Sequence, residues 1–219
     1  MVSNKSLFLS TPPYLTALFR GCEYPWQVLD KLSGYINELM SSPPEGFTEY
    51  APGVFIGEGV KIAECVSIIA PAIIGKNTEI RHGAFLRGGV ITGEGCVIGN
   101  STEIKNSVLL DRVQIPHYNY VGDSILGNGA HLGAGAVLSN LKADGKSVAV
   151  HADKDYQTGR RKLGAILADG ANVGCGAVLN PGTVICCDSV VYPLTAVRGV
   201  ICADSIVKSM DNIIKRTTE

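Results

Sequence analysis

Residues 56–115 read IGEGVK-IAECVS-IIAPAI-IGKNTE-IRHGAF-LRGGVI-TGEGCV-IGNSTE-IKNSVL-LDRVQI, with an apolar residue opening almost every block of six. We call these opening positions the beats: Ile56, Ile62, Ile68, Ile74, Ile80, Leu86, Ile98, Ile104 and Leu110, with Thr92 as the only exception. A smaller side chain stands four residues after each beat: Val60, Val66, Ala72, Thr78, Ala84, Val90, Cys96, Thr102 and Val108.

A period of six residues is typical of a parallel β-helix. Over six residues, a beat and the residue two before it, which is the small residue of the preceding block, lie on the same side of an extended strand. Both point into a narrow interior. Glycine directly after the beat, as at Gly57 and Gly75, permits the sharp turn to the next face. Three faces make one coil of about eighteen residues, and coils stack about 4.8 Å apart. The pattern therefore predicts an all-β domain.

The pattern is interrupted at Pro116–Asn119, where the phase slips by four residues. We expect it to restart at Tyr120, Leu126, Leu132 and Leu138. An irregularity in a regular β stack re-aims side chains, and histidine is the side chain best suited to take a proton at neutral pH. His117 is therefore a candidate general base, with a purely structural histidine as the alternative.

The flanking segments differ from the repeat. Residues 1–45 are predicted to form a helical appendage, in which Val28, Leu32 and Ile36 fall on one helical face. Residues 139–165 form a polar insertion in the β-helix, which we assign to residues 46–200. Residues 201–219 are predicted to form a helix that caps the open end of the solenoid, with Ile206, Met210, Ile213 and Ile214 on its apolar face.

The bulk composition excludes several classes of protein. The chain has 219 residues, 46% of them hydrophobic, and a formal net charge of −1, which argues against nucleic-acid binding. Residues 1–10 lack the apolar core of a signal peptide and no apolar run is long enough to cross a membrane, so we expect a cytoplasmic protein. Seven cysteines without a CxxC pair predict reduced, mostly buried thiols.

Two clusters of basic residues are candidate anion sites. Arg87 and Lys105 follow beats one coil apart, so they are expected to stack and to clamp a phosphate. The alternative is a pair of solvated charges balanced by Glu103. Arg160 and Arg161, in the insertion, could bind the phosphates of coenzyme A or simply keep the loop solvated.

The segment His117-Tyr-Asn-Tyr-Val-Gly-Asp-Ser124, followed by Leu132-Gly-Ala-Gly135 and Asn140, resembles a known family. It looks like the left-handed β-helix domain of the bifunctional UDP-N-acetylglucosamine pyrophosphorylase/glucosamine-1-phosphate N-acetyltransferase, over roughly residues 56–198. The resemblance implies a left-handed coil, a homotrimer in which the 139–165 arm reaches a neighbouring subunit, and acetyl-CoA as co-substrate. The implied acceptor is a phosphorylated or nucleotide-linked amino sugar.

The resemblance also assigns roles to residues. It makes His117 the general base, Arg87 and Lys105 the phosphate ligands, Tyr120 and Asn140 substrate residues, and Ala134 a neighbour of the thioester. The chain departs from the family at His131, where a sugar-contacting asparagine is usual, and at Cys175, where the family has a serine that helps to stabilise the reacting centre. At Pro193 the family has a small residue on the coenzyme side; Cys175 and Pro193 are thus the candidate coenzyme neighbours besides Ala134. The Gly-x-Gly-Thr-Arg nucleotide loop is missing from the sequence, so no nucleotidyl transfer is expected.

Two other functions remain open. The departures at His131 and Cys175 favour a non-catalytic protein that binds a sugar nucleotide or serves in assembly. A zinc-dependent hydratase similar to the γ-class carbonic anhydrases is less favoured, because His82, His117, His131 and His151 contain no pair five residues apart. We therefore expect no metal in the site.

Overall fold

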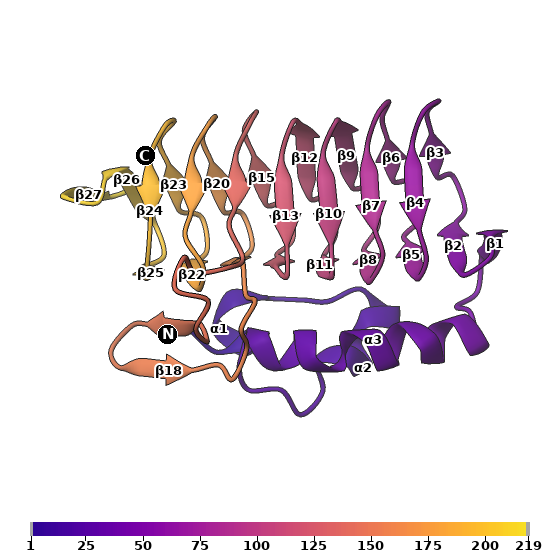
Figure 1. Cartoon of the computed structure of the whole chain (residues 1–219), viewed down its shortest axis with the longest axis horizontal. Helices are drawn as coiled ribbons and strands as arrows, with labels where there is room; N and C mark the ends of the chain where they lie inside the picture. The colour runs from indigo at the N-terminus through magenta and orange to yellow at the C-terminus, as the bar shows by residue number, and fades with distance from the viewer. Residues whose placement is uncertain (1, 218–219) are drawn as a thin grey trace.

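The computed structural model of the chain describes residues 2–217 and forms a three-sided parallel β-helix (Figure 1). Its sides are two nine-stranded sheets, A and B, and a seven-stranded sheet, C. Sheet A contains β1 (Phe47–Ala51), β2 (Val54–Gly57), β5 (Ala72–Ile74), β8 (Val90–Thr92), β11 (Ser107–Leu109), β14 (Ile125–Leu126), β19 (Ala165–Leu167), β22 (Thr183–Ile185) and β25 (Val200–Ile201). Sheet B contains β3 (Lys61–Ile62), β6 (Glu79–Ile80), β9 (Val97–Asn100), β12 (Gln114–His117), β15 (His131–Leu132), β20 (Asn172–Val173), β23 (Val190–Val191), β26 (Ser205–Ser209) and β27 (Asn212–Lys215). Sheet C contains β4 (Ser67–Ile69), β7 (Phe85–Arg87), β10 (Glu103–Lys105), β13 (Tyr120–Gly122), β16 (Val137–Leu138), β21 (Val178–Leu179) and β24 (Ala196–Val197).

The beats fill the interior of the solenoid, as the period of six predicts. Ile74, Ile80 and Leu86 come from sheets A, B and C in turn, and each is at most 1% exposed. Full burial of one such side chain contributes about 1.5–3 kcal/mol. Stacked over successive coils, the beats form one continuous core.

The predicted phase of the repeat is wrong between Ile104 and Leu126, whereas the predicted beats Leu126, Leu132 and Leu138 are confirmed as core residues. In between, the inward residues are Leu109, Ile115 and Val121, because Leu109 pairs with Thr92 and Val121 pairs with Ile104. The four-residue slip at Pro116–Asn119 does not exist; instead, two corners between sheets C and A are each one residue shorter. Leu110, predicted as a beat, packs outside the coil on the helical side, and Tyr120 faces outward from sheet C.

The N-terminal segment is helical, as predicted, and covers sheet A (Figure 1). It contains α1 (Asn4–Leu7), a 3-10 turn (Pro13–Leu15), α2 (Thr16–Phe19) and α3 (Pro25–Ser41). Helix α3 starts with Pro25 in its first turn, where a missing N–H costs nothing. Leu32 and Ile36 of α3 pack with the outward-facing Ile91 of sheet A, and the Tyr14 hydroxyl donates to the Thr92 carbonyl at 2.5 Å.

The inserted segment 139–165 folds back onto its own chain rather than standing out as a loop. It forms the antiparallel hairpin β17 (Ala149–His151) and β18 (Asp155–Gln157), shown below the solenoid in Figure 1. Val150 is fully buried, and the Tyr156 ring lies 5.3 Å from Tyr24 and 6.0 Å from Trp26. The apolar side chains of this arm thus pack against the same chain. The sequence predicted a polar arm that reaches a neighbouring subunit and did not anticipate this packing.

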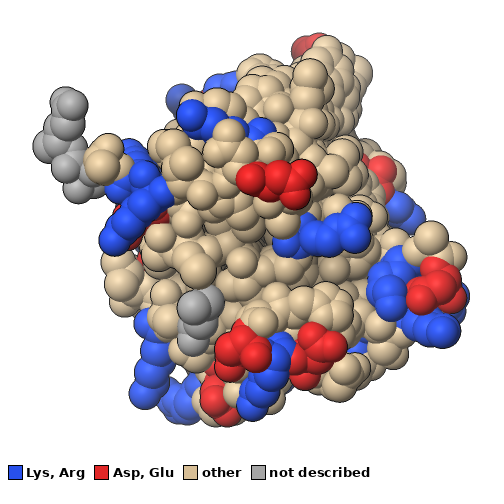
Figure 2. Space-filling view, turned by 90° about the vertical axis from the view of Figure 1, so that its left-hand side faces the viewer, with Lys and Arg blue, Asp and Glu red and all other residues tan. Residues whose placement is uncertain are grey.

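The predicted C-terminal helix over 201–219 is wrong. Strands β25 and β26 continue the coils, and β27 pairs antiparallel with β26. Val207 occupies an inward position of the repeat and is fully buried. The β-branched residues Ile206, Ile213 and Ile214 favour strands over a helix. Residues 218 and 219 lie outside the described residues. Figure 2 views the molecule from this end, where basic and acidic side chains are intermixed.

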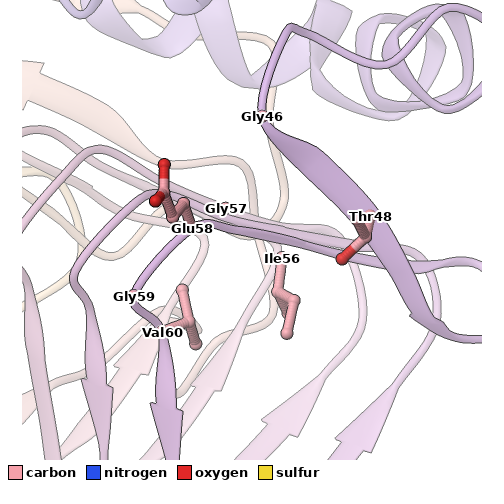
Figure 3. Close-up of a pocket in the computed structure, with 7 residues that line it drawn as sticks. All are labelled: Gly46, Thr48, Ile56, Gly57, Glu58, Gly59 and Val60. Carbon is pink, nitrogen blue, oxygen red and sulfur yellow. The ribbon is translucent and has the colours of Figure 1, made fainter.

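The opposite end of the solenoid begins with β1, which pairs antiparallel with β2. Figure 3 shows the hollow at this first coil, where Ile56 and Val60 point the same way while Glu58 points away from them. Within residues 2–217, none of the helices combines the length and hydropathy needed to cross a membrane.

Candidate active site

One corner of the β-helix, between sheets B and C, stacks four of the predicted site residues. Backbone N–H groups of Gly135, Gly176 and Leu194 donate to the carbonyl oxygens of His117, Ala134 and Cys175, at 3.0, 2.8 and 2.9 Å. This repeat puts four residues at the same position of successive coils, about 4.8 Å apart. We call them the imidazole column: His117, Ala134, Cys175 and Pro193.

His117 ends β12 and is exposed. Its backbone N–H donates to the side chain of Asn119, which is itself buried and donates to the carbonyl of Gly133 at 2.7 Å. The next residue, Tyr118, has a positive φ of 51° and is 65% exposed. A left-handed conformation is costly for a bulky residue, by about 1–3 kcal/mol, so this corner is held in place by the surrounding coils.

The other edge of sheet C carries the two predicted cations. Lys105 follows Ile104, which pairs with Leu86, so Lys105 lies beside Arg87 in the next coil. Arg87 donates to Glu103 at 2.7 Å, and this carboxylate raises the pKa of the guanidinium. Both charges of that pair are partly exposed. For Lys105, no ion pair is found within the described chain.

Tyr120 and Asn140 meet over Gly122 at this same edge. A Cβ added to Gly122 would lie 2.6 Å from the Asn140 amide nitrogen and 2.7 Å from the Tyr120 hydroxyl, so only glycine leaves room for both. Burial raises the pKa of Tyr120, and the nearby carboxylates Glu103 and Asp123 raise it further, while a hydrogen bond from Asn140 and the charge of Arg87 oppose the rise. The phenol therefore stays protonated and able to donate.

Of the remaining predicted residues, His131 and Arg161 lie away from both edges of sheet C, whereas Arg160 lies next to the edge that carries Asn140. His131 faces outward on sheet B, where its ring nitrogen is 3.1 Å from the Asn172 side chain. Arg161 is exposed in the arm and donates to the Gly145 carbonyl at 3.2 Å. Arg160 forms an ion pair with Asp30 of α3 and lies 3.8 Å from Asp123.

A pocket of about 590 Å³ lies between the base of the arm and the later coils. Its basic residues are Lys142, His151 and Arg198; from the sequence, only His151 was considered, and then as a zinc ligand. Arg198 follows the beat Val197, as Arg87 follows Leu86, and this periodicity was the signal that could have found it.

Among the described residues the seven cysteines form no disulfide, and the prediction that they are mostly buried is wrong, since Cys65, Cys175 and Cys202 are exposed. Between residues 2 and 217, no three His, Cys, Asp or Glu side chains come close enough together to hold a metal ion.

Comparison with known proteins gives relatives for most of the chain. The family model described as the GMPPB C-terminal domain matches residues 68–155. The bifunctional protein GlmU of Methanococcus maripaludis is 31% identical over 194 residues, covering 87% of this chain and 47% of that protein. A bifunctional sugar-1-phosphate nucleotidylyltransferase/acetyltransferase of Sulfurisphaera tokodaii is 34% identical over 182 residues, covering 77% of this chain and 43% of that protein. The chain thus spans less than half the length of these relatives.

Solved structures give more distant likenesses. PerB from Caulobacter crescentus, in complex with CoA and GDP-perosamine, has a TM-score of 0.40 at 15% identity, covering 75% of this chain and 57% of that one. The polySia-specific acetyltransferase NeuO has a TM-score of 0.46 at 13% identity, covering 76% of this chain and 88% of that one. At such scores, neither likeness bears on the site.

Proposed function

We propose that the chain is an acyltransferase that moves the acetyl group of acetyl-CoA onto the amine of a phosphorylated or nucleotide-linked amino sugar, similar to glucosamine 1-phosphate. The observation that carries this is the arrangement around sheet C. The imidazole column, with the exposed His117, lies along one edge, the cations Arg87 and Lys105 lie on the other, and the outward-facing Tyr120 lies between them. The name of the Sulfurisphaera tokodaii relative, a bifunctional sugar-1-phosphate nucleotidylyltransferase/acetyltransferase, supports the same choice.

In the proposed reaction the amine nitrogen of the acceptor attacks the thioester carbonyl. A ring nitrogen of His117 takes the amine proton, the new C–N bond forms, the C–S bond breaks, and the coenzyme leaves as a thiol after protonation. Arg87 and Lys105 hold the phosphate of the acceptor, which fixes the amine near His117. Glu103, already paired with Arg87, keeps that guanidinium in place before substrate binds.

The coenzyme is proposed to run along the imidazole column, from His117 past Ala134 towards Cys175 and Pro193. Exposed apolar side chains follow that column, including Leu194 at 85% and Tyr192 at 42% exposure, and they suit the apolar parts of the pantetheine arm. Of the two arginines predicted for the coenzyme phosphates, Arg161 is the more available. Arg160 is already engaged with Asp30. His131, on the outer face of sheet B, remains a proposed sugar contact.

The test is acetyl transfer from acetyl-CoA to glucosamine 1-phosphate, followed as release of free thiol. His117→Ala is expected to lower kcat by about 100-fold or more, the usual contribution of a general base, while leaving the fold unchanged. Arg87→Ala is expected to raise KM chiefly for phosphorylated acceptors. Unchanged turnover in His117→Ala would refute the assignment of the base, and an equal loss with unphosphorylated amines would refute the clamp.

A second candidate is a non-catalytic protein that binds a sugar nucleotide or serves in assembly. The Arg87–Glu103 ion pair favours it, because the guanidinium already has a counter-ion without any substrate. Calorimetry with acetyl-CoA separates the two functions. A catalyst must bind it, and an assembly protein need not.

We further propose that the protein works as a homotrimer in the cytoplasm and does not catalyse nucleotidyl transfer. The outer face of sheet C supports the trimer, since the helices and the arm pack on the other side, and Val178 and Ala196 are exposed on it. The seven free thiols suit a reducing compartment.

A further inference from the structure

The two shortened corners of the solenoid place Asn106 and Asp123 one above the other. Each corner turns through a residue with positive φ, 44° at Asn106 and 49° at Asp123, a conformation that Asn and Asp tolerate better than other side chains. In the following coil the same corner carries Asn140, after which the arm leaves the solenoid. Irregular corners of this kind re-aim side chains.

The Asp123 carboxylate is the centre of this corner. It is 4% exposed, and its two oxygens accept from two different amides: Asn106 at 2.6 Å and Asn140 at 2.5 Å. Arg160 brings a guanidinium nitrogen to 3.8 Å, which offsets part of its charge. The backbone of Asp123 is held as well, because its N–H donates to Lys105 and its carbonyl accepts from Gly164.

This carboxylate decides which way the Asn140 amide points. A carboxylate only accepts hydrogen bonds, so the Asn140 nitrogen must face Asp123. That same nitrogen and the Tyr120 hydroxyl both lie over Gly122, 2.6 and 2.7 Å from the position of an added Cβ, so the two groups are neighbours. The contacts therefore run from the buried Asp123 through Asn140 to Tyr120, beside the edge where Arg87 and Lys105 lie.

We propose that Asp123 is a positioning residue, which fixes the Asn140 amide and through it the Tyr120 hydroxyl, so that this hydroxyl presents its donor to the anionic group of the acceptor. The proposal rests on the function proposed above, and it names the phosphate end of the acceptor as the part that Asp123 serves. Asp123 itself touches no substrate, because it is covered by Asn106, Asn140 and Arg160.

The first variant is Asp123→Asn, which keeps the size of the side chain and its tolerance of a positive φ. Two amide donors then face one carbonyl oxygen and one amide nitrogen, so one of them must turn away. We expect KM for glucosamine 1-phosphate to rise about tenfold or more, the effect of losing a hydrogen bond to a charged group, while KM for acetyl-CoA changes little.

The second variant separates positioning from folding. Asp123→Asn combined with Asn140→Asp restores one donor facing one acceptor and the original charge, but turns a carboxylate towards Tyr120 and the phosphate. We expect the thermal midpoint to recover and KM for glucosamine 1-phosphate to stay high. Recovery of both would show that these hydrogen bonds serve the fold alone and would overturn the proposal. If Asp123→Asn does not fold, this double variant provides the same KM measurement.

Asn106→Gly is the matched control. It removes the other donor to the same carboxylate, on the side away from Tyr120, and glycine accepts the positive φ of this corner. We expect lower stability with unchanged KM. If the wild-type protein shows no turnover, the proposed function and this inference are both refuted. If the wild type is active and Asp123→Asn leaves KM for glucosamine 1-phosphate unchanged, only the inference is refuted.

Discussion

Cys96 shows how a single interior position responds to pH. It occupies one of the small inward positions of the repeat and is fully buried, with its sulfur 3.1 Å from the Leu110 carbonyl oxygen. This burial raises the pKa of the thiol to about 12. In the unfolded chain this thiol ionises near pH 9. Between these values the folded state keeps a proton that the unfolded state has lost, so stability falls as pH rises above about 9.

We therefore expect Cys96→Ala to flatten the pH dependence of unfolding. Urea unfolding of both proteins from pH 8 to 11 measures it. The wild type should lose up to about 1.4 kcal/mol per pH unit more than the variant in this range. Parallel curves for the two proteins would contradict the assignment. Tyr14, whose pKa is raised by burial and, to a lesser extent, by Cys96, is present in both proteins.

Helix α3 offers a test of how far the appendage is part of the fold. Gly34 lies in the middle of α3 and is exposed, and an added Cβ there would meet no other atom within 4 Å. Gly34→Ala is expected to raise the free energy of unfolding by about 1 kcal/mol, because alanine loses less backbone entropy in a helix. Denaturant unfolding measures it.

Gly75→Ala is the control for that substitution. An added Cβ at Gly75 would overlap the carbonyl of Gly93 in the next coil, so this variant should be destabilised, by about 1–3 kcal/mol. If Gly34→Ala left the free energy unchanged, α3 would unfold separately from the solenoid.

The elements also show what the sequence could predict. The period of six correctly predicted the stacked strands, and it placed Arg87 beside Lys105 because the coil between them has its full length. The predicted phase was wrong from Ile104 to Leu126, where Leu109 and Leu110 are both apolar and a shortened corner decides which of them faces inward. The pairing of Arg160 with Asp30 joins an insertion to a helix 130 residues away, which no local pattern reveals.

At the scale of the whole molecule, the proposed homotrimer would form through the exposed outer face of sheet C. Light scattering should report three times the chain mass of 23.1 kDa. Val178→Arg, on this face, is expected to shift the protein towards monomers, because a charge would have to be buried without a partner. Asn172→Arg, exposed on the neighbouring sheet B, should leave the mass unchanged. A monomeric wild type would contradict the trimer.

The antiparallel strands β1 and β27 also limit how such molecules can join end to end. A stack of parallel coils is a template for fibre growth, since a second copy could continue the strands at its open edges. At one end β1 forms the edge of sheet A antiparallel to the coils, and at the other end β27 does so for sheet B. A further copy stacked in the same direction would meet a reversed strand at either end, so it could not continue the parallel pairing of all three sheets. The reversal of one strand at each end therefore opposes growth of the parallel stack into a filament.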